Sequence, residues 1–465
     1  MNWRQLLSEK RIEKEEPPAG TRDLRSEFEK DYHRIIVSAS FRRLQDKTQV
    51  FPLDRSDFIR TRLTHSLEVS SLGRSLAQNI GTAILTDGLD PSFTEKNLRD
   101  ICDILQCAGL IHDIGNPPFG HFGEEAIREW FRKKLPQLTT MGKPVRDFLS
   151  EQQYLDLLHF EGNAQGLRMV TRLDYPVQRF GMNLTAGLLS ASMKYPTPST
   201  GIRRDSGEAK SMKMGYFSSE EEICGLIVKE TGTEGERNPL ALVLEAADDI
   251  AYATADIEDA FKKGFFSYGT LIWELQQRGV CKKWRDALSD NYDMARLSGV
   301  MGPEEYAIRT WLRDMQDVLI VAATEGFVSN YGRIMQGRFG GELISGRQAA
   351  ALLRALKGIA YDYAFTSMSI FKTEVAANHV ITWLLDVLVP AALTYDGGGT
   401  IGLMEEKYLS LIPENYRQVY HRTTEGKDSA GCVYHRILLA TDTVSGMTDS
   451  YARDLYAELT GIQKI

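Results

Sequence analysis

The amino-acid sequence predicts a mostly α-helical protein. Apolar residues recur at three- and four-residue steps along most of the 465-residue chain, which is the spacing of the buried face of a helix. Alternating apolar and polar residues, the mark of half-buried strands, form no extended block in the sequence, and no internal repeat of fixed period is found. We therefore expect an all-α fold in which helix packing positions the side chains that carry chemistry.

The chain is expected to begin with an arm and then enter a helical core. Residues 1–30 are charged and contain Pro17-Pro18, which predicts an N-terminal arm that leads into the fold. A helical pattern runs over residues 31–44. A loop is expected at residues 51–57, and a long helix is expected over residues 59–80.

A near-continuous apolar run over residues 101–114 predicts a central, buried helix. This run places His112 and Asp113 side by side near its end. Gly115 and the pair Pro117-Pro118 then interrupt the helix, because glycine frees the backbone and proline removes backbone donors.

Helical patterns continue to the C-terminus and are separated by polar or glycine-rich connections. Further helices are expected at 121–134, 163–173, 182–193, 239–261, 269–277, 306–324, 347–364 and 374–388, with a last helical section ending near residue 459. Loop insertions are expected at 136–158 and 196–221, and a break is expected at Gly397-Gly398-Gly399. The charge of the second insertion changes from basic to acidic along its length. That change is typical of a solvated loop, although the basic half would also suit a lid over an anionic ligand.

The bulk properties of the chain exclude several classes of protein. A net charge of −8 argues against a generally basic nucleic-acid binder. The 5 cysteines are scattered, which favours reduced thiols over a disulfide framework or a zinc ribbon. The N-terminus lacks the apolar region of a signal peptide. The most apolar stretch, Trp383 to Tyr395, is interrupted by Asp386 and Pro390 and is too short to span a bilayer. We expect a soluble, cytoplasmic protein without a membrane segment.

Four residues within helical patterns are candidate metal ligands: His65, His112, Asp113 and Asp248. Imidazole and carboxylate both bind divalent cations, and two of each suit Mn²⁺, Mg²⁺ or Fe²⁺ as well as Zn²⁺. A single histidine would more often be an ordinary core or surface residue. The adjacent His-Asp pair is more informative, because an unpaired buried carboxylate is costly. Arg62 lies three residues before His65, so its guanidinium could reach a phosphate held at such a metal.

Helical spacing adds further groups to this candidate site. Asp248, Tyr252 and Asp256 recur at intervals of four residues and therefore share one face of a helix. His121 and Glu124 lie three residues apart, so their side chains can touch as a general acid–base pair.

These residues lie within longer stretches that resemble a known family. The order of the four candidate ligands resembles the H…HD…D signature of HD-domain phosphohydrolases. A closer resemblance, to the bacterial dGTPase (deoxynucleoside triphosphate triphosphohydrolase) family, rests on the stretches Phe41–Leu53, Arg60–Ser66, His112–Glu125, His159–Gln165, Glu245–Asp256 and Val444–Ala452. Because these stretches follow one another along the chain, the resemblance covers nearly its whole length.

The resemblance implies a fold and a reaction. It implies an HD-domain catalytic core over residues 31–265, followed by a helical C-terminal region over residues 266–465 that contributes to the active site and to oligomer contacts. The implied reaction is metal-dependent hydrolysis of deoxynucleoside triphosphates, dGTP among them, to the deoxynucleoside and inorganic tripolyphosphate, which would regulate the dNTP pool. The implied cofactor is a divalent cation, Mn²⁺ or Mg²⁺ ahead of Fe²⁺ or Zn²⁺. The resemblance also suggests a homo-oligomer, a hexamer.

The resemblance also implies roles for individual residues. The implied metal ligands are His65, His112, Asp113 and Asp248. The implied catalytic dyad is His121 with Glu124. The implied substrate contacts are Arg62, Lys194 and Tyr195 at the triphosphate, Gln49 (or Gln45), Tyr252 and Asp256 at the sugar 3′-OH, and His159, with Glu161, in a further phosphate-side motif. A sugar site packed this closely would reject ribonucleotides at the 2′ carbon.

Two other functions would use the same residues. Another HD-superfamily phosphohydrolase or phosphodiesterase would share the metal site, but the stretches outside the ligands favour the dGTPase family. A nucleotide- or single-stranded-DNA-binding regulator is disfavoured, because every metal and dyad position holds a competent residue and the acidic balance gives no broad footprint for DNA. A secondary site for a dNTP effector or single-stranded DNA would be sought at Arg203-Arg204, Lys210 and Lys213. The sequence does not indicate which base is preferred.

Overall fold

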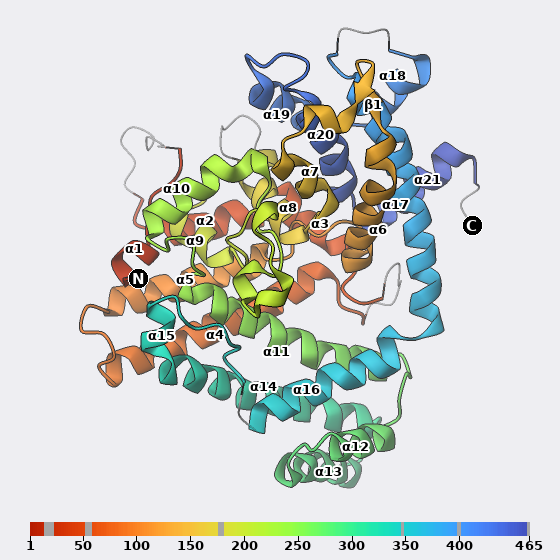
Figure 1. Ribbon diagram of the computed structural model, residues 1–465. Helices are drawn as coiled ribbons and strands as arrows, with labels where there is room; N and C mark the ends of the chain where they lie inside the picture. The colour runs from red at the N-terminus through yellow and green to blue at the C-terminus, as the bar shows by residue number, and fades with distance from the viewer. Residues whose placement is uncertain (14–22, 52–57, 175–180, 346–347, 398–400, 463–465) are drawn as a thin grey trace.

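The computed structural model describes residues 1–13, 23–51, 58–174, 181–345, 348–397 and 401–462 (Figure 1). Within these residues the protein is built almost entirely of helices, which confirms the mostly helical fold. Two short strands occur among the described residues, β1 (Thr139–Thr140) and β2 (Lys143–Pro144). They form an antiparallel hairpin within the loop insertion predicted at residues 136–158.

The helices follow one another with short connections. The first half of the chain forms α1 (Trp3–Leu6), α2 (Glu27–Ile36), α3 (Ala39–Arg43), α4 (Arg62–Thr86), α5 (Glu95–Ile111), α6 (Gly120–Lys134), α7 (Glu151–Leu158), α8 (Gly162–Arg168), α9 (Ala186–Ser192), α10 (Glu221–Thr231) and α11 (Pro239–Lys262). The second half forms α12 (Tyr268–Gln277), α13 (Lys282–Leu297), α14 (Pro303–Ser329), α15 (Tyr331–Met335), α16 (Gln348–Ala360), α17 (Met368–Thr394), α18 (Leu403–Ser410), α19 (Glu414–Thr424), α20 (Val433–Ser445) and α21 (Asp449–Thr460). Turns of π-helix, Met169–Leu173 and Tyr361–Phe365, extend α8 and α16.

Helices α4 and α5 form the centre of the fold and pack closely against each other. Each begins with a capping box, at Thr61 for α4 and at Thr94 for α5, which satisfies backbone donors at the start of the helix. Gly109 of α5 lies directly against the α4 backbone, and a Cβ atom there would be 2.5 Å from Cα of Ser70. The two helices therefore approach more closely than a side chain at this position would allow, and α11 packs against both.

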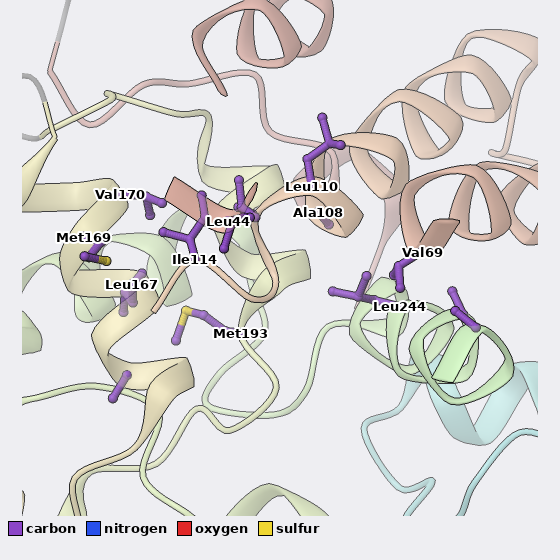
Figure 2. Close-up of a cluster of buried hydrophobic side chains, with 14 of the residues drawn as sticks. Leu44, Val69, Ala108, Leu110, Ile114, Leu167, Met169, Val170, Met193 and Leu244 are labelled. Atoms are coloured by element: carbon purple, nitrogen blue, oxygen red, sulfur yellow. The ribbon is translucent and has the colours of Figure 1, made fainter. Parts of the chain in front are cut away.

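A cluster of buried hydrophobic side chains connects these three helices (Figure 2). Val69 comes from α4, Leu110 from α5 and Leu244 from α11, and all three are buried. Truncating a buried leucine to alanine typically costs about 2–5 kcal/mol. The cluster therefore fixes the relative positions of the helices that carry the candidate metal ligands.

Helix α17 joins the C-terminal region to the core. It runs along one side of the molecule and packs against α6 and α20 (Figure 1). The helix expected over residues 374–388 is longer than predicted, because α17 starts at Met368 and continues through Asp386 and Pro390 to Thr394. The Asp386 carboxylate is satisfied by Trp130 of α6, whose Nε1–H donates to Oδ1 at 2.9 Å. By length and composition α17 could cross a membrane, but half of its apolar window is buried inside the protein.

Other element boundaries also differ from those expected. Helix α5 ends at Ile111, three residues before the predicted end, and α10 and α13 were not anticipated. The N-terminal residues are docked on the core, where the buried Trp3 donates its Nε1–H to the Tyr331 hydroxyl at 2.7 Å. Residues 52–57 of the predicted loop, and two of the three glycines at 397–399, lie outside the described residues.

Candidate metal centre and active site

The four candidate metal ligands converge from three helices. His65 lies in the first turns of α4, His112 caps the end of α5 with Asp113 next to it, and Asp248 lies in the middle of α11. One ligand atom from each of His65, His112 and Asp113 lies within 4.8 Å of the others. His65 Nε2 is 3.1 Å from Asp248 Oδ1, and His112 Nε2 is 3.7 Å from the same oxygen.

The end of α5 explains how adjacent residues can point at one place. Beyond Ile111 the helical hydrogen bonds give way to tighter turns, in which the Ile114 N–H donates to Ile111 and the Asn116 N–H to Asp113, and His112 Nε2 lies 3.7 Å from Asp113 Oδ1. The His112 Nδ1–H donates to the Gly109 carbonyl at 2.7 Å, which leaves Nε2 as the nitrogen with a lone pair. This buried Nε2 has no hydrogen-bond partner among the described residues. The donor set and this unpartnered nitrogen fit a divalent cation.

The two carboxylates of the site are held in the ionised form. Arg62 Nη1 donates to Asp113 Oδ2 at 2.7 Å, and Asn116 donates to the other oxygen. Burial acts to raise the pKa of Asp113, but Arg62 and the two histidines hold that pKa well below its usual range. Burial likewise acts on Asp248, and the hydrogen bond with His65 lowers the pKa of Asp248 to about 2. Ionised carboxylates are what metal ligation requires.

The candidate acid–base dyad lies at the start of α6. His121 Nδ1 is 3.2 Å from Glu124 Oε2, and the other Glu124 oxygen accepts the Gly162 N–H at 2.8 Å. Glu124 is buried, whereas the His121 ring is largely exposed. Burial opposes ionisation of Glu124, but the hydrogen bond with His121 lowers its pKa below the usual range. An ionised Glu124 accepts the His121 Nδ1–H and leaves Nε2 free to exchange a proton.

A second buried carboxylate lies beside the dyad. Glu161 accepts a hydrogen bond from Asn163 and forms a 3.0 Å ion pair with Lys213. Burial, and then the charge on Glu124, raises the pKa of Glu161. The Arg128 guanidinium lies within 3.9 Å of Glu124 and within 3.8 Å of Glu161 and so partly offsets their mutual repulsion.

A cavity of about 710 Å³ opens above the metal ligands. His112, Asp113, Asp248 and His121 line it, and His65 and Glu124 lie behind this wall. Its volume is within the range of small-molecule sites. The cavity therefore brings the metal ligands and the dyad to one concave surface.

Most of the predicted substrate contacts line the same cavity, but two do not. The residues that line it are Gln49, Arg62, Lys194, Tyr195 and Tyr252. Asp256 is buried beyond Tyr252, and its Oδ2 has no hydrogen-bond partner among the described residues. His159 is half-buried outside the cavity wall.

Several lining residues were not predicted as contacts of the main site. The sequence suggested Lys213 for a secondary site or for a lid over an anionic ligand, and its ammonium faces the cavity beside the dyad. Lys357, Tyr361 and Phe365 come from α16 and its π turn and form the opposite wall. The alternation of charge in residues 196–221 was the one sequence signal for Lys213. Nothing local to α16 indicates that it faces this cavity.

The lysines at the cavity are paired with acidic residues. Lys194 Nζ lies 3.1 Å from Glu245 Oε1, and Lys357 Nζ lies 2.7 Å from Asp249 Oδ1. Burial opposes the charged form of Lys194, yet the Glu245 carboxylate raises the pKa of Lys194 above its usual range. The Lys194 ammonium therefore stays charged, and the ion pairs hold both side chains in fixed positions at the cavity wall.

Comparison with known proteins adds to this geometry. The sequence model of the HD domain matches residues 62–159, which include His65, His112 and the dyad. The chain is 40% identical to a deoxyguanosinetriphosphate triphosphohydrolase-like protein of Listeria monocytogenes, over 99% of this chain and 100% of that protein. It is 35% identical to a protein of the same description from Pseudomonas aeruginosa, over 99% of both chains. It is 33% identical to the deoxyguanosinetriphosphate triphosphohydrolase of Salmonella typhimurium, over 94% of both chains.

Proposed function

Because this chain belongs to the deoxyguanosinetriphosphate triphosphohydrolase family of HD-domain proteins, we propose that it hydrolyses deoxynucleoside triphosphates, dGTP among them, to the deoxynucleoside and inorganic tripolyphosphate. One observation carries the proposal beyond the family name. The cavity places the His-His-Asp-Asp cluster next to a histidine–carboxylate dyad and to basic side chains. Cleavage at the α-phosphate needs all three groups on one surface.

The metal centre is proposed to hold Mn²⁺ or Mg²⁺, with Fe²⁺ and Zn²⁺ as alternatives. His65, His112, Asp113 and Asp248 would supply the ligand atoms, and the unpartnered Nε2 of His112 supports this assignment. When bound, such a cation supplies Lewis-acid chemistry at a phosphate. Arg62 adds a fixed positive charge beside it, because its guanidinium is held by Asp113 at the cavity wall.

The dyad is proposed to move the proton. Glu124 accepts the Nδ1–H of His121 and so sets which ring nitrogen carries the lone pair. The Nε2 atom of His121 can then position the attacking water or, when protonated, donate a proton to the leaving 5′ oxygen. The exposed ring of His121 at the cavity gives this nitrogen access to substrate.

The remaining lining residues are proposed to bind the substrate. Lys194, Tyr195 and Lys213 lie where they can hold the triphosphate together with Arg62. Gln49 and Tyr252 can contact the sugar, and Asp256 would act through Tyr252 because it does not line the cavity itself. His159 lies outside the cavity wall, so any role in substrate binding would be indirect, through the motif His159–Gln165.

We propose a cytoplasmic homo-oligomer, a hexamer by family resemblance, that regulates the dNTP pool, with residues 266–465 contributing to the oligomer contacts and, through Lys357 and Tyr361, to the cavity wall. For a dNTP effector or single-stranded DNA, the candidates outside the cavity are Arg203-Arg204 and Lys210, and Lys210 already pairs with Glu236 at 2.6 Å.

A product-resolved assay tests the proposed function. The purified protein is incubated with each of four dNTPs and four NTPs, with Mg²⁺ or Mn²⁺, and tripolyphosphate, pyrophosphate and orthophosphate are separated. We expect tripolyphosphate from at least one dNTP and little from NTPs. His112→Ala and Asp113→Ala should abolish the release, whereas His33→Ala, at an exposed histidine of α2, should not. Pyrophosphate as the product, or turnover that survives His112→Ala, would favour another HD-superfamily phosphohydrolase.

A further inference from the structure

The turn that presents His121 has an unfavourable backbone conformation. Phe119 has φ of 63° and Gly120 has φ of 62°, so two successive residues are left-handed. A side chain is rarely tolerated in this region, and Phe119 is a bulky, buried one. Gly120 is favoured at its position, because φ of 62° strains any other residue and an added Cβ atom would be 2.5 Å from Arg62 Nη2, which would have to shift. The turn therefore needs support from elsewhere in the structure.

That support comes from the far end of the chain. The backbone N–H of Phe119 donates to Oδ1 of Asp449 at 2.9 Å, although the two residues are 330 positions apart. Oδ2 of Asp449 accepts the N–H of Thr48 at 3.0 Å and its hydroxyl at 2.6 Å. Asp449 is buried, and no side chain next to the turn caps the start of α6. Asp449 thus acts as a helix cap supplied from a distance, where a carboxylate is favoured by the helix dipole.

Neighbouring contacts dock the segment that carries Asp449. The buried Lys47 donates to the backbone carbonyl of Ser445 at 2.9 Å and to that of Asn116 at 2.5 Å. The Ser450 hydroxyl donates to Asp46 at 2.9 Å. The segment between α20 and α21 is therefore fixed against both the residues before α4 and the loop before α6.

We propose that Asp449 is a positioning residue for the acid–base dyad, because its carboxylate holds the left-handed turn at Phe119 that aims His121 into the cavity. The inference rests on the proposed role of His121. His121 lies two residues beyond Phe119, and its side chain is 81% exposed with Glu124 as its hydrogen-bond partner. Few packing contacts orient such a ring, so the backbone of the turn sets where it points. Asp449 does not line the cavity and would act through this backbone alone.

Asp449→Asn tests the proposal with little change in volume. The amide retains one acceptor oxygen, so it cannot accept from both Phe119 and Thr48. We expect kcat to fall about 10-fold, KM to change less than kcat, and metal affinity to stay within about two-fold, because Asp449 holds the turn before His121 and reaches the substrate contacts only through Thr48, the neighbour of Gln49. Ser450→Ala is the matched control, because it removes one docking contact of the same segment, the hydrogen bond to Asp46, and leaves the hydrogen bonds of Asp449 in place. It should leave kcat and KM near those of the wild type.

A double-mutant cycle separates positioning from general destabilisation. If Asp449 acts through His121, Asp449→Asn should change the residual kcat of a His121→Ala variant by less than about two-fold. An equal loss in both backgrounds, or a rise in KM that matches the fall in kcat, would overturn the proposal.

A second readout does not depend on the reaction. Amide hydrogen exchange in a peptide that covers residues 119–122 should be faster in Asp449→Asn than in the wild type and unchanged in Ser450→Ala. Unchanged protection in Asp449→Asn would refute the inference. If the wild type hydrolyses no dNTP, the proposed function fails, and the exchange experiment still decides whether Asp449 holds the turn.

Discussion

Replacing Glu124 by glutamine isolates the proton-transfer role of the dyad. The substitution keeps the oxygen that accepts the Gly162 N–H at 2.8 Å, so the loop before α8 stays anchored. It replaces the oxygen 3.2 Å from His121 Nδ1 by an amide NH₂, which can only donate. The imidazole must then present Nδ1 as the acceptor and carry its proton on Nε2. Nε2, which faces the substrate, would then have no lone pair to accept a proton from water, and as the N–H of a neutral imidazole it would be a much weaker proton donor than an imidazolium.

The size of this effect follows from the role of the dyad. General acid–base catalysis contributes about 10²–10⁴-fold, so we expect kcat of Glu124→Gln to fall by about 10²–10³-fold, which corresponds to about 3–4 kcal/mol of transition-state stabilisation. Because Glu124 does not line the cavity, KM for the dNTP should change little. Tripolyphosphate release measured over a range of dNTP concentrations gives both constants.

The neighbouring residue supplies a matched control. Glu125→Gln makes the same chemical change one position later, at a half-exposed carboxylate that pairs with Arg128 and Arg132 on the surface of α6. Exposed ion pairs contribute little, so kcat should stay near the wild-type value. If Glu124→Gln retained kcat within about three-fold of the wild type, or raised KM instead, the role of the dyad in proton transfer would be refuted.

Other predictions follow from the same structure. Lys213→Met should raise KM for the dNTP about 10-fold in steady-state assays, because a triphosphate contact is lost. Lys210→Met, in the same loop but outside the cavity, should leave KM unchanged. Equal effects of the two substitutions would contradict the proposed contact between Lys213 and the triphosphate. Burial raises the pKa of Asp156 to about 6. Because this folded-state pKa lies above the unfolded one, the stability from Asp156 is fully present below the unfolded pKa, is lost as pH rises through about 6, and changes no further at higher pH. Between about pH 4 and pH 7, the free energy of unfolding measured in urea should fall in the wild type by on the order of 3 kcal/mol relative to Asp156→Asn. If the unfolding free energies of the two proteins changed in parallel with pH, the prediction would be refuted. Gly109→Ala should lower the melting temperature, because the added Cβ atom meets the α4 backbone. Gly225→Ala should leave the melting temperature unchanged or raise it, because Gly225 lies in α10 with open space around it. A similar decrease in both variants would contradict the close approach of α4 and α5.

The sequence singled out the candidate metal ligands because each lies in a strong local pattern. Helical periodicity placed His65 and Asp248 in long helices, and the adjacent His112-Asp113 pair was unusual in an apolar run. Periodicity did not show that α5 ends at Ile111 and is followed by tighter turns, with His112 Nε2 3.7 Å from Asp113 Oδ1. That ending depends on packing around the loop that follows, and local propensity does not report it.

The residues that the sequence missed reach the site through long-range contacts. Lys357 and Tyr361 lie more than a hundred positions beyond Asp248 in the chain, and only the packing of α16 against α11 brings them to the cavity. Asp449 reaches the His121 turn from near the C-terminus. The opposite error arose at Asp256, whose helical spacing predicted a cavity contact but which lies buried beyond Tyr252. Spacing identifies the face of a helix and does not show where along that face the cavity ends.

Net charge was equally uninformative about the site, and the ion pairs explain why. A chain of net charge −8 is proposed to bind a highly anionic triphosphate, yet the lysines at the cavity are already paired: Lys194 with Glu245, Lys213 with Glu161 and Lys357 with Asp249. These carboxylates fix the long, flexible side chains before substrate arrives, so less conformational entropy remains to be lost on binding. They also mask the positive charge in any count of acidic and basic residues. A triphosphate site in an acidic protein therefore depends on which charges meet at the cavity, and that information resides in the packing of α9, α11, α16 and the loop that carries Lys213.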